Sequence, residues 1–307
     1  MELSILIVSW NVVDPLDACL KSLQPAIDRE KVELIVVDSA SSDETVQHLR
    51  QHFPWVRVFP QSENVGFTRG NNLALREARG DVLMLLNPDT EVLGDALQQM
   101  LDFLKTHPQT GIVGPHTLNS DGTTQSTRRR FPTLLTSLFE STWLQSLAPQ
   151  SVLDRYYVRD GSDDATLDVD WVQGSALMAR RQVYEQIGPL DEGYIMFSEE
   201  LDWCRRARDA GWQVAYLGSA KIVHHGGKST DQVVAQRHIY FQQSKLRYFR
   251  KYHGMLTAQA LRLFLLASYV LQLGQEAAKG LIGHKRQLRQ ERVRQYLEVL
   301  RSGLKVT

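Results

Sequence analysis

Continuous apolar runs alternate with amphipathic stretches over the first 115 residues of the chain. The apolar runs cover residues 3–8, 32–37 and 82–86. Runs of this kind predict strands that are buried on both faces of a sheet. The amphipathic stretches cover residues 16–27, 44–51 and 71–79 and predict helices. Ser41-Ser42-Asp43-Glu44 predicts a capping box at the start of the second helix. This βαβα order predicts a parallel, doubly wound α/β sheet.

The pattern changes after residue 115. Residues 116–170 predict loops and short helices. A strand is expected over residues 169–179, a helix over 198–210, and short strands over 213–217 and 221–225. From about residue 232 the pattern is helical to the end. We therefore expect a catalytic or binding domain over residues 1–231, with halves at 1–115 and 116–231, and a helical extension over residues 232–307.

Charge is unevenly distributed along the 307 residues, although the formal net charge is +0. Residues 232–307 hold 14 Lys and Arg against 3 Asp and Glu, so this segment carries +11 and residues 1–231 carry −11. Such asymmetry favours an anionic partner surface, either a membrane or a nucleic acid. No recognition-helix or RNP-like motif is present, which argues against nucleic acid. The two cysteines predict neither a disulfide scaffold nor a four-cysteine zinc site, and they suit a reducing cytosol.

Polar residues follow the predicted strands, where ligands of doubly wound sheets bind. These segments are Ser9-Trp10-Asn11, Asp38-Ser39 and Asn87-Pro88-Asp89. Asp38 is placed to accept hydrogen bonds from a nucleobase or ribose, or it is satisfied by backbone amides. Asp89 is placed to bind a divalent cation together with diphosphate oxygens, or it belongs to a strand-ending turn.

Two further segments carry candidate chemistry. Ser198-Glu199-Glu200-Leu201-Asp202 either provides a general base or stabilises the first turn of a helix through its dipole. His224-His225-Gly226-Gly227 either completes a metal site or forms a surface turn. Residues 64–72 match neither G-x-G-x-x-G nor a P-loop, which argues against nicotinamide dehydrogenases and P-loop NTPases.

Taken in order, these segments resemble family 2 glycosyltransferases, in particular the rhamnosyltransferase-like branch of bacterial surface-polysaccharide enzymes. The resemblance runs from residue 3 to about residue 255 and implies the GT-A fold. Its motifs include Val36-Val37-Asp38-Ser39, Asn64-Val65-Gly66-Phe67, Asn87-Pro88-Asp89, Trp171-Val172-Gln173-Gly174, Phe197-Ser198-Glu199-Glu200 and His224-His225-Gly226-Gly227. Arg247-Tyr248-Phe249-Arg250-Lys251-Tyr252-His253-Gly254 is typical of that branch.

The resemblance implies roles for individual residues. Binding of a nucleotide-sugar is implied for Ser9, Asn11, Asp38, Asn64, Gly66, Asn87, Gly174 and Glu199. Asp89 and His224 would be ligands of Mg²⁺ or Mn²⁺, and Glu200 would be the catalytic base. The chain departs from the family pattern at two positions, because Asn87 replaces the first acid of the Asp-x-Asp motif and Glu200 replaces an Asp. The second departure leaves the choice between Glu199 and Glu200 open.

The function implied is an inverting transfer of a sugar, with rhamnose favoured, from a nucleotide-diphosphate sugar to a hydroxyl of a glycan or lipid-linked glycan. dTDP-rhamnose is the favoured donor and a polyprenyl-diphosphate-glycan is one acceptor. The alternatives are a non-catalytic nucleotide-sugar-binding partner and a polyprenyl-phosphate glycosyltransferase. We expect a cytoplasmic protein on the inner face of the plasma membrane.

The C-terminal segment has two interpretations. Residues 252–275 hold a single charge, Arg262, and the uncharged run over 263–275 is shorter than the roughly 18–20 residues that span a bilayer. This segment either packs on the catalytic domain or on a second subunit, giving a homodimer, or it lies on anionic lipid of the inner leaflet. Arg128-Arg129-Arg130 is expected in a solvated surface loop, with contact to an acceptor diphosphate as the alternative.

Overall fold

The computed structural model describes residues 1–26, 31–140, 142–159, 161–226, 234–282 and 285–305. The chain forms two compact units. The first contains Met1–Phe131, Tyr157–Glu192 and Glu199–Ser229, and the second contains Pro132–Tyr156, Gly193–Ser198 and Thr230–Thr307. The expected boundary at residues 231 and 232 lies outside the described residues, as does Gly227. Two segments that we expected in the first domain, 132–156 and 193–198, belong with the C-terminal helices.

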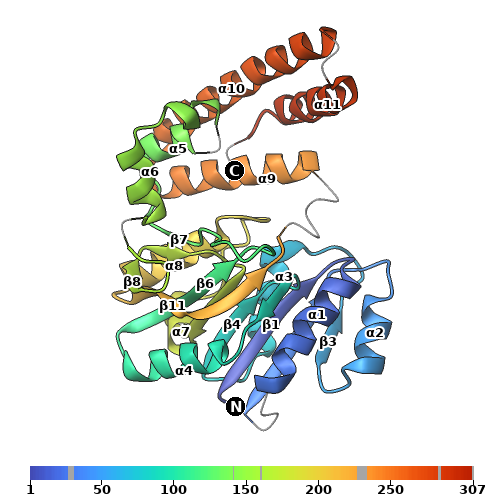
Figure 1. Cartoon of the computed structure of the whole chain (residues 1–307), viewed down its shortest axis with the longest axis vertical. Coiled ribbons are helices and arrows are strands. Elements are labelled where there is room, and N and C mark those ends of the chain that lie inside the picture. Colours follow the sequence, from blue (N-terminus) through green and yellow to red (C-terminus); the bar gives the residue numbers. More distant parts are fainter. Residues whose placement is uncertain (27–30, 141, 160, 227–233, 283–284, 306–307) are drawn as a thin grey trace. The chain divides into compact units, whose positions relative to one another are not determined.

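The first unit is built on a mixed sheet in which nine strands are described, ordered β3-β2-β1-β4-β10-β6-β11-β5, with β8 paired to β11 (Figure 1). The strands are β1 (Leu3–Ser9), β2 (Val32–Asp38), β3 (Arg57–Pro60), β4 (Val82–Leu86), β5 (Thr90–Val92), β6 (Thr110–Leu118), β8 (Thr166–Val169), β10 (Ala176–Arg180) and β11 (Gln213–His224). Strands β3, β2, β1 and β4 are parallel to one another, as predicted. Strand β10 is antiparallel to β4 and β6, so the second half of the sheet is mixed.

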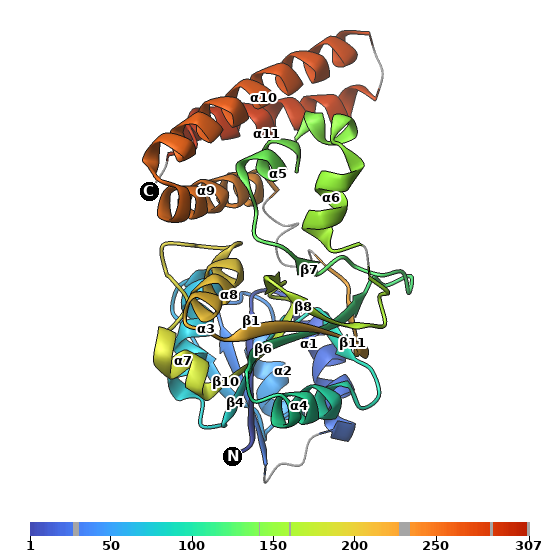
Figure 2. The same ribbon diagram turned by 90° about the vertical axis from the view of Figure 1, so that its left-hand side faces the viewer.

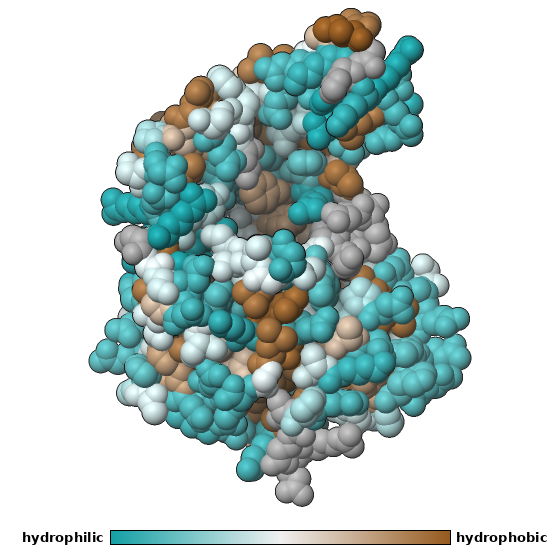
Figure 3. Space-filling model, viewed as in Figure 1, coloured by the Kyte–Doolittle hydropathy of each residue, from teal (hydrophilic) through white to brown (hydrophobic). Residues whose placement is uncertain are grey.

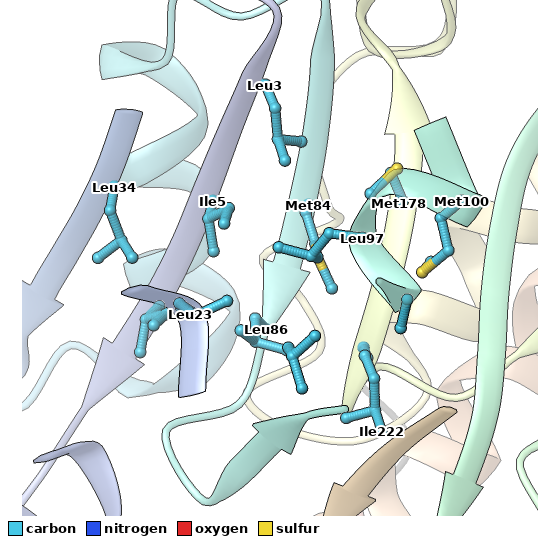
Figure 4. Close-up of a cluster of buried hydrophobic side chains, with 14 of the residues drawn as sticks. Leu3, Ile5, Leu23, Leu34, Met84, Leu86, Leu97, Met100, Met178 and Ile222 are labelled. Carbon is cyan, nitrogen blue, oxygen red and sulfur yellow. The ribbon is translucent and has the colours of Figure 1, made fainter. Parts of the chain in front are cut away.

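Helices cover both faces of this sheet, which explains the continuous apolar runs. On one face, Ile5 and Ile7 of β1 pack with α1 (Val13–Leu23), α2 (Thr45–His52) and α4 (Ala96–Thr106). Figure 4 shows Ile5 in this cluster with Leu23, Leu97 and Met100. On the other face, Leu6 packs with α3 (Gly66–Glu77), α7 (Arg181–Ile187) and α8 (Glu199–Asp209). Successive side chains of a strand point to opposite faces, so every position of β1 must be apolar or hydrogen-bonded. The predicted α/β architecture with flanking helices is confirmed.

Several predicted elements differ in detail. No capping box forms at α2, because Ser41 bonds to Asp38 instead, and Asp43 Oδ1 accepts from the backbone N–H and the hydroxyl of Thr45. The helix expected at residues 71–79 begins earlier, at Gly66. Residues 213–224 form one strand with a break in register between Leu217 and Lys221, where two strands were expected. The region expected as one strand over residues 169–179 is divided among β8, β9 (Trp171–Val172) and β10.

The second unit is helical within its described residues (Figure 2). Its helices are α5 (Leu134–Phe139), η2 (Trp143–Leu147), α9 (Val234–His253), α10 (Met255–Leu281) and α11 (Arg286–Ser302), and α6 (Gln150–Tyr157) belongs to it except for Tyr157. Helix α10 packs along α11 and α9. The uncharged run over residues 263–275 is short, but α10 as a whole has 27 residues and is long and apolar enough to cross a membrane. It is the one such helix among the described residues.

Candidate active site at the carboxyl edge of the sheet

Most predicted site residues lie at a strand end or on a loop that follows one, whereas Gly66 begins α3 and Glu199 and Glu200 begin α8. Ser9 pairs with Asp38 at the ends of β1 and β2, and β4 ends beside them at Leu86. Because β10 is antiparallel to β4, its first residue, Ala176, pairs with Leu86 at the same edge. The N–H of Asn87 donates to the carbonyl of Ser175 at 2.9 Å, which joins the segment after β4 to the segment that contains Gly174. The topology therefore gathers these segments at one edge of the sheet.

The Asp38 carboxylate is 1% exposed and already holds three internal hydrogen bonds. Its Oδ1 accepts from Ser41 N–H at 3.0 Å, and its Oδ2 accepts from the hydroxyls of Ser41 at 2.6 Å and Ser9 at 3.1 Å. Asn11, which has a φ of 51°, accepts a bond from Ser42 N–H through its Oδ1 at 2.7 Å. A carboxylate offers about four lone-pair sites, so Asp38 retains about one acceptor position for a ligand.

Asn64 fixes the loop that leads into α3. Its Oδ1 accepts from the Ser39 hydroxyl at 3.0 Å and from Gly66 N–H at 2.9 Å. Ser39 directly follows Asp38, and its hydroxyl also accepts from Val65 N–H at 2.9 Å. Gly66 has a φ of 74°, a conformation that favours glycine. The structure therefore brings Asn64 and Gly66 next to the end of β2.

Asn87, Asp89 and His224 form a second cluster. Asp89 Oδ1 lies 3.3 Å from His224 Nε2, and Asn87 Nδ2 lies 3.3 Å from the same nitrogen. Asp89 is 6% exposed. The pairing of β11 with β5 sets His224 opposite Thr90, which directly follows Asp89. Two residues that are 135 positions apart in the sequence are thus held in contact by one strand pair.

Gln125, which was not among the predicted site residues, orients the imidazole of His224. Gln125 Oε1 lies 2.7 Å from His224 Nδ1, while Gln125 Nε2 donates to Asn119 Oδ1 at 2.9 Å. Since Oε1 is an acceptor, Nδ1 carries the proton in this arrangement. In neutral His224 the lone pair is then on Nε2, which faces Asp89. A hydrogen-bonded second ring nitrogen is the usual arrangement of metal-binding histidines.

This cluster fits a divalent cation. The Nε2 lone pair of neutral His224 and the Asp89 carboxylate converge, and Asn87 Oδ1 is buried with no hydrogen-bond partner. Oxygen ligands and an imidazole suit Mg²⁺ or Mn²⁺. Within the described residues no group of three or more His, Cys, Asp and Glu side chains could hold a metal ion. A cation here would therefore take further ligands from its substrate.

Glu199 and Glu200 begin α8 and are 4% and 8% exposed. The two residues before them, Phe197 and Ser198, have φ values of 69° and 65°, which are strained for residues with a Cβ. Gly174 N–H donates to Glu200 Oε1 at 3.4 Å, and the Gly174 backbone lies against the Glu200 side chain. The Oε2 atoms of both glutamates are buried without a hydrogen-bond partner. A substrate hydroxyl could satisfy either atom.

Burial raises the pKa of both glutamates, but the two differ. The pKa of Glu199 is raised well above its usual value by burial and by the neighbouring Glu200 charge. The pKa of Glu200 is raised by burial and lowered by backbone N–H groups, including that of Gly174, and by the Arg129 cation. Glu200 therefore has specific anion-stabilising partners, and within the pair it is the residue that ionises first.

One of those partners, Arg129, belongs to the small sheet of β7 (Arg128–Arg129) and β9. Arg129 pairs with Trp171, and its guanidinium stacks on the rings of Tyr157 at 4.5 Å and Trp171 at 5.9 Å. Arg128 is 5% exposed and bonds to the carbonyl of Val158, so the expected solvated loop is wrong at this position. The Nε and Nη2 atoms of Arg128 donate to the carbonyls of Val158 and Gly161, and Nη2 lies 2.8 Å from Asp163 Oδ1, which offsets the cost of burying this cation.

Comparison with known proteins identifies the family. Residues 4–187 match the sequence model described as glycosyl transferase family 2. The chain is 29% identical over 239 residues to N-acetylglucosaminyl-diphospho-decaprenol L-rhamnosyltransferase of Mycobacterium tuberculosis, covering 74% of this chain and 77% of the relative. It is 22% identical over 255 residues to rhamnosyltransferase WbbL of Escherichia coli K12, covering 80% and 92%.

Solved structures share the fold. The mannosyltransferase PcManGT of Pyrobaculum calidifontis, in complex with GDP-Man and Mn²⁺, superposes with a TM-score of 0.60 at 16% identity, covering 99% of this chain and 86% of that one. GalNAc-T7 with UDP, GalNAc and Mn²⁺ gives a TM-score of 0.59 at 15% identity. It covers 81% of this chain, which spans about half (48%) of GalNAc-T7. These neighbours have the GT-A fold that the sequence predicted.

Proposed function

This chain belongs to glycosyl transferase family 2, and we propose that it transfers a hexose, with L-rhamnose favoured, from a nucleoside-diphosphate sugar to a glycan hydroxyl. The observation that supports the proposal is that the cluster of Asn87, Asp89 and His224 and the buried carboxylates of Glu199 and Glu200 lie at one edge of the sheet. dTDP-rhamnose is the favoured donor because two relatives are named rhamnosyltransferases. The favoured acceptor is a glycan on polyprenyl diphosphate, because the mycobacterial relative is named for an N-acetylglucosaminyl-diphospho-decaprenol substrate.

The donor's nucleoside is assigned to the network around Asp38. Its remaining acceptor position would take a base N–H or a ribose hydroxyl, and the Asn64 and Gly66 loop would lie beside it. Ser9 and Asn11 act by holding Asp38 and the segment after it in place. Because Asp38 would contact the donor directly and Ser9 only holds Asp38 in place, loss of Ser9 should weaken donor binding less than loss of Asp38.

Mg²⁺ or Mn²⁺ is assigned to Asp89, His224 and the Asn87 oxygen. When bound, the cation supplies electrostatic neutralisation of the departing diphosphate. The contribution of the chain is to hold these oxygen and nitrogen donors in place before substrate arrives. Gln125 does so for the imidazole, and strands β11 and β5 do so for Asp89.

Glu200 is assigned as the general base. Its carboxylate would take the proton of the acceptor hydroxyl as that oxygen attacks the anomeric carbon. One C–O bond forms, the bond to the diphosphate breaks on the opposite face, and the configuration inverts. Burial and the neighbouring Glu200 charge hold the pKa of Glu199 well above its usual value, so within the pair Glu199 would keep its proton and donate a hydrogen bond to the donor sugar.

Three variants test these assignments in a transfer assay with dTDP-rhamnose and, in parallel, UDP- and GDP-sugars. Asp89→Ala should abolish transfer that depends on divalent cations while the fold survives, and unchanged turnover would remove the metal assignment. Glu200→Gln should lower kcat by about 10²–10⁴. If Glu199→Gln lost activity and Glu200→Gln kept wild-type rates, Glu199 would be the base. A protein that binds nucleotide-sugars without any transfer or hydrolysis would instead be a non-catalytic partner. Transfer directly to polyprenyl phosphate would favour the other enzyme class.

A further inference from the structure

Exposed large hydrophobic side chains are concentrated in the second unit. Of the sixteen found among the described residues, fourteen lie there, and only Met1 and Leu93 lie in the first unit. The second unit is the smaller of the two, so size does not explain this distribution. An apolar surface of this extent on one unit marks an interaction site.

Helix α10 carries the largest share of this surface, six of the fourteen residues. Eight exposed residues follow one face at alternating spacings of four and three, and none is charged: Leu256, Ala260, Leu263, Ala267, Val270, Gly274, Ala277 and Leu281. The charged side chains Arg262 and Glu276 point elsewhere, since Arg262 Nε donates to the Gly303 carbonyl at 2.7 Å and Glu276 Oε2 accepts from Arg289 at 2.5 Å. Apolar side chains are visible along this helix at the top of Figure 3.

A second apolar group lies on α5 and η2. Leu134 and Leu135 are 39% and 50% exposed, Trp143 is 42% exposed and Leu147 is 67% exposed. Helix α5 contacts α10, so this group and the α10 face belong to neighbouring elements. A half-exposed tryptophan beside leucines is the composition found where proteins meet the boundary between lipid headgroups and acyl chains.

The charge of the second unit identifies the occupant. Its segments hold 15 Lys and Arg against 6 Asp and Glu, a net charge of +9, and those of the first unit carry −9. Exposed cations of α11 and its flanks include Lys285, Arg286, Arg294 and Arg301. An apolar face on a cationic unit is complementary to a bilayer that contains anionic lipid.

We propose that the second unit docks on the surface of an anionic lipid bilayer through the exposed faces of α10, α5 and η2. Helix α10 lies in the interface and does not span the membrane. One of its faces packs on α9 and on α11, a helix with five arginines from Arg286 to Arg301 that cannot enter hydrocarbon without a large penalty. This inference extends the proposed location at the inner face of the plasma membrane, and lipid binding requires neither donor nor metal.

The test is co-sedimentation of the full-length protein with vesicles of phosphatidylcholine, alone or with 30% phosphatidylglycerol. Binding should be stronger with the anionic vesicles and should weaken as salt is raised. The double variant L263D/V270D and the single variant W143S should each lower the partition coefficient by about tenfold. The control L93D, at a leucine of the first unit that is 40% exposed, should bind as wild type does. Circular dichroism verifies that each variant is folded.

Four outcomes would overturn the proposal. The wild-type protein could fail to bind at low salt, or L93D could weaken binding as much as L263D/V270D. Resistance of bound protein to carbonate extraction would indicate a spanning helix. If the wild-type protein were a dimer that did not bind vesicles, and L263D/V270D dissociated it, the exposed uncharged face of α10 would instead bind a second copy of the chain. Transfer to a water-soluble acceptor, measured in parallel, separates failure of lipid docking from failure of the proposed enzyme activity.

Discussion

Gln125→Leu tests whether His224 is a metal ligand that a neighbouring residue orients. The substitution removes the acceptor that lies 2.7 Å from Nδ1 and keeps a side chain of similar size. Loss of a hydrogen bond of this kind costs about 1–1.5 kcal/mol, or roughly a factor of 5–12 in affinity. The neutral ring would also be divided between two tautomers, only one of which presents the Nε2 lone pair to Asp89. We therefore expect Mn²⁺ affinity and kcat/KM to fall by about 10- to 100-fold.

The assay is a Mn²⁺ titration followed by electron paramagnetic resonance in the presence of dTDP, with transfer rates measured alongside. Gln125→Glu keeps an acceptor oxygen beside Nδ1 and should retain metal binding. Gln98→Leu, on the exposed face of α4, controls for loss of a glutamine elsewhere. If Gln125→Leu bound Mn²⁺ as tightly as wild type while Asp89→Ala did not, orientation of His224 by Gln125 would be irrelevant to the site.

Three further predictions concern charge and packing. Burial and the neighbouring Glu200 charge raise the pKa of Glu199 in the folded protein, so its contribution to stability is fully present below about pH 4.5 and is lost as pH rises through the folded pKa. Glu199→Gln should therefore melt above wild type at pH 8 and converge with it below about pH 4.5 in a fluorimetric melt. Arg129→Gln removes a cation that lowers the pKa of Glu200, so the acidic limb of the kcat profile should move to higher pH, and an unmoved limb would contradict the electrostatic role. Asn72→Ala leaves the buried N–H and C=O of Leu190 unsatisfied and should destabilise the fold by roughly 2–5 kcal/mol in urea unfolding.

The parallel half of the sheet could be predicted closely because its strands are buried on both faces. In β4 the apolar run and the strand coincide at Val82–Leu86. Successive residues of this strand face opposite layers of helices, so all of them must be apolar. The candidate site was predictable for a related reason, because residues that follow such strands meet at one edge. Asp38 and Asp89 required only this rule, and the family resemblance added Glu200 and His224.

Other features depend on contacts that the local sequence does not encode. Ser41 was expected to cap α2, but in the fold it bonds to the buried carboxylate of Asp38. Arg128 was expected in solvent because a run of three arginines is strongly polar, yet tertiary contacts with Val158 and Asp163 allow its burial. Gln125 lies in a stretch without periodicity, and its partner is 99 residues away. A glutamine in a region predicted as loops and short helices gives no local sign of such a role.

The second unit is assembled from three separate stretches of chain, and this limits how it can be removed. A protein shortened at residue 226 would lose α9, and with it the Lys245 ammonium that lies 3.1 Å from Glu140 Oε2 and the Ser244 hydroxyl that donates to the Met196 carbonyl. Residues 132–156 and the stretch that leads directly into Glu199 would then be stripped of their support. Inactivity of such a truncated protein would thus have two explanations, disorder of the segment that leads into Glu199 and loss of lipid binding. Point substitutions on the outer helix faces separate these two effects.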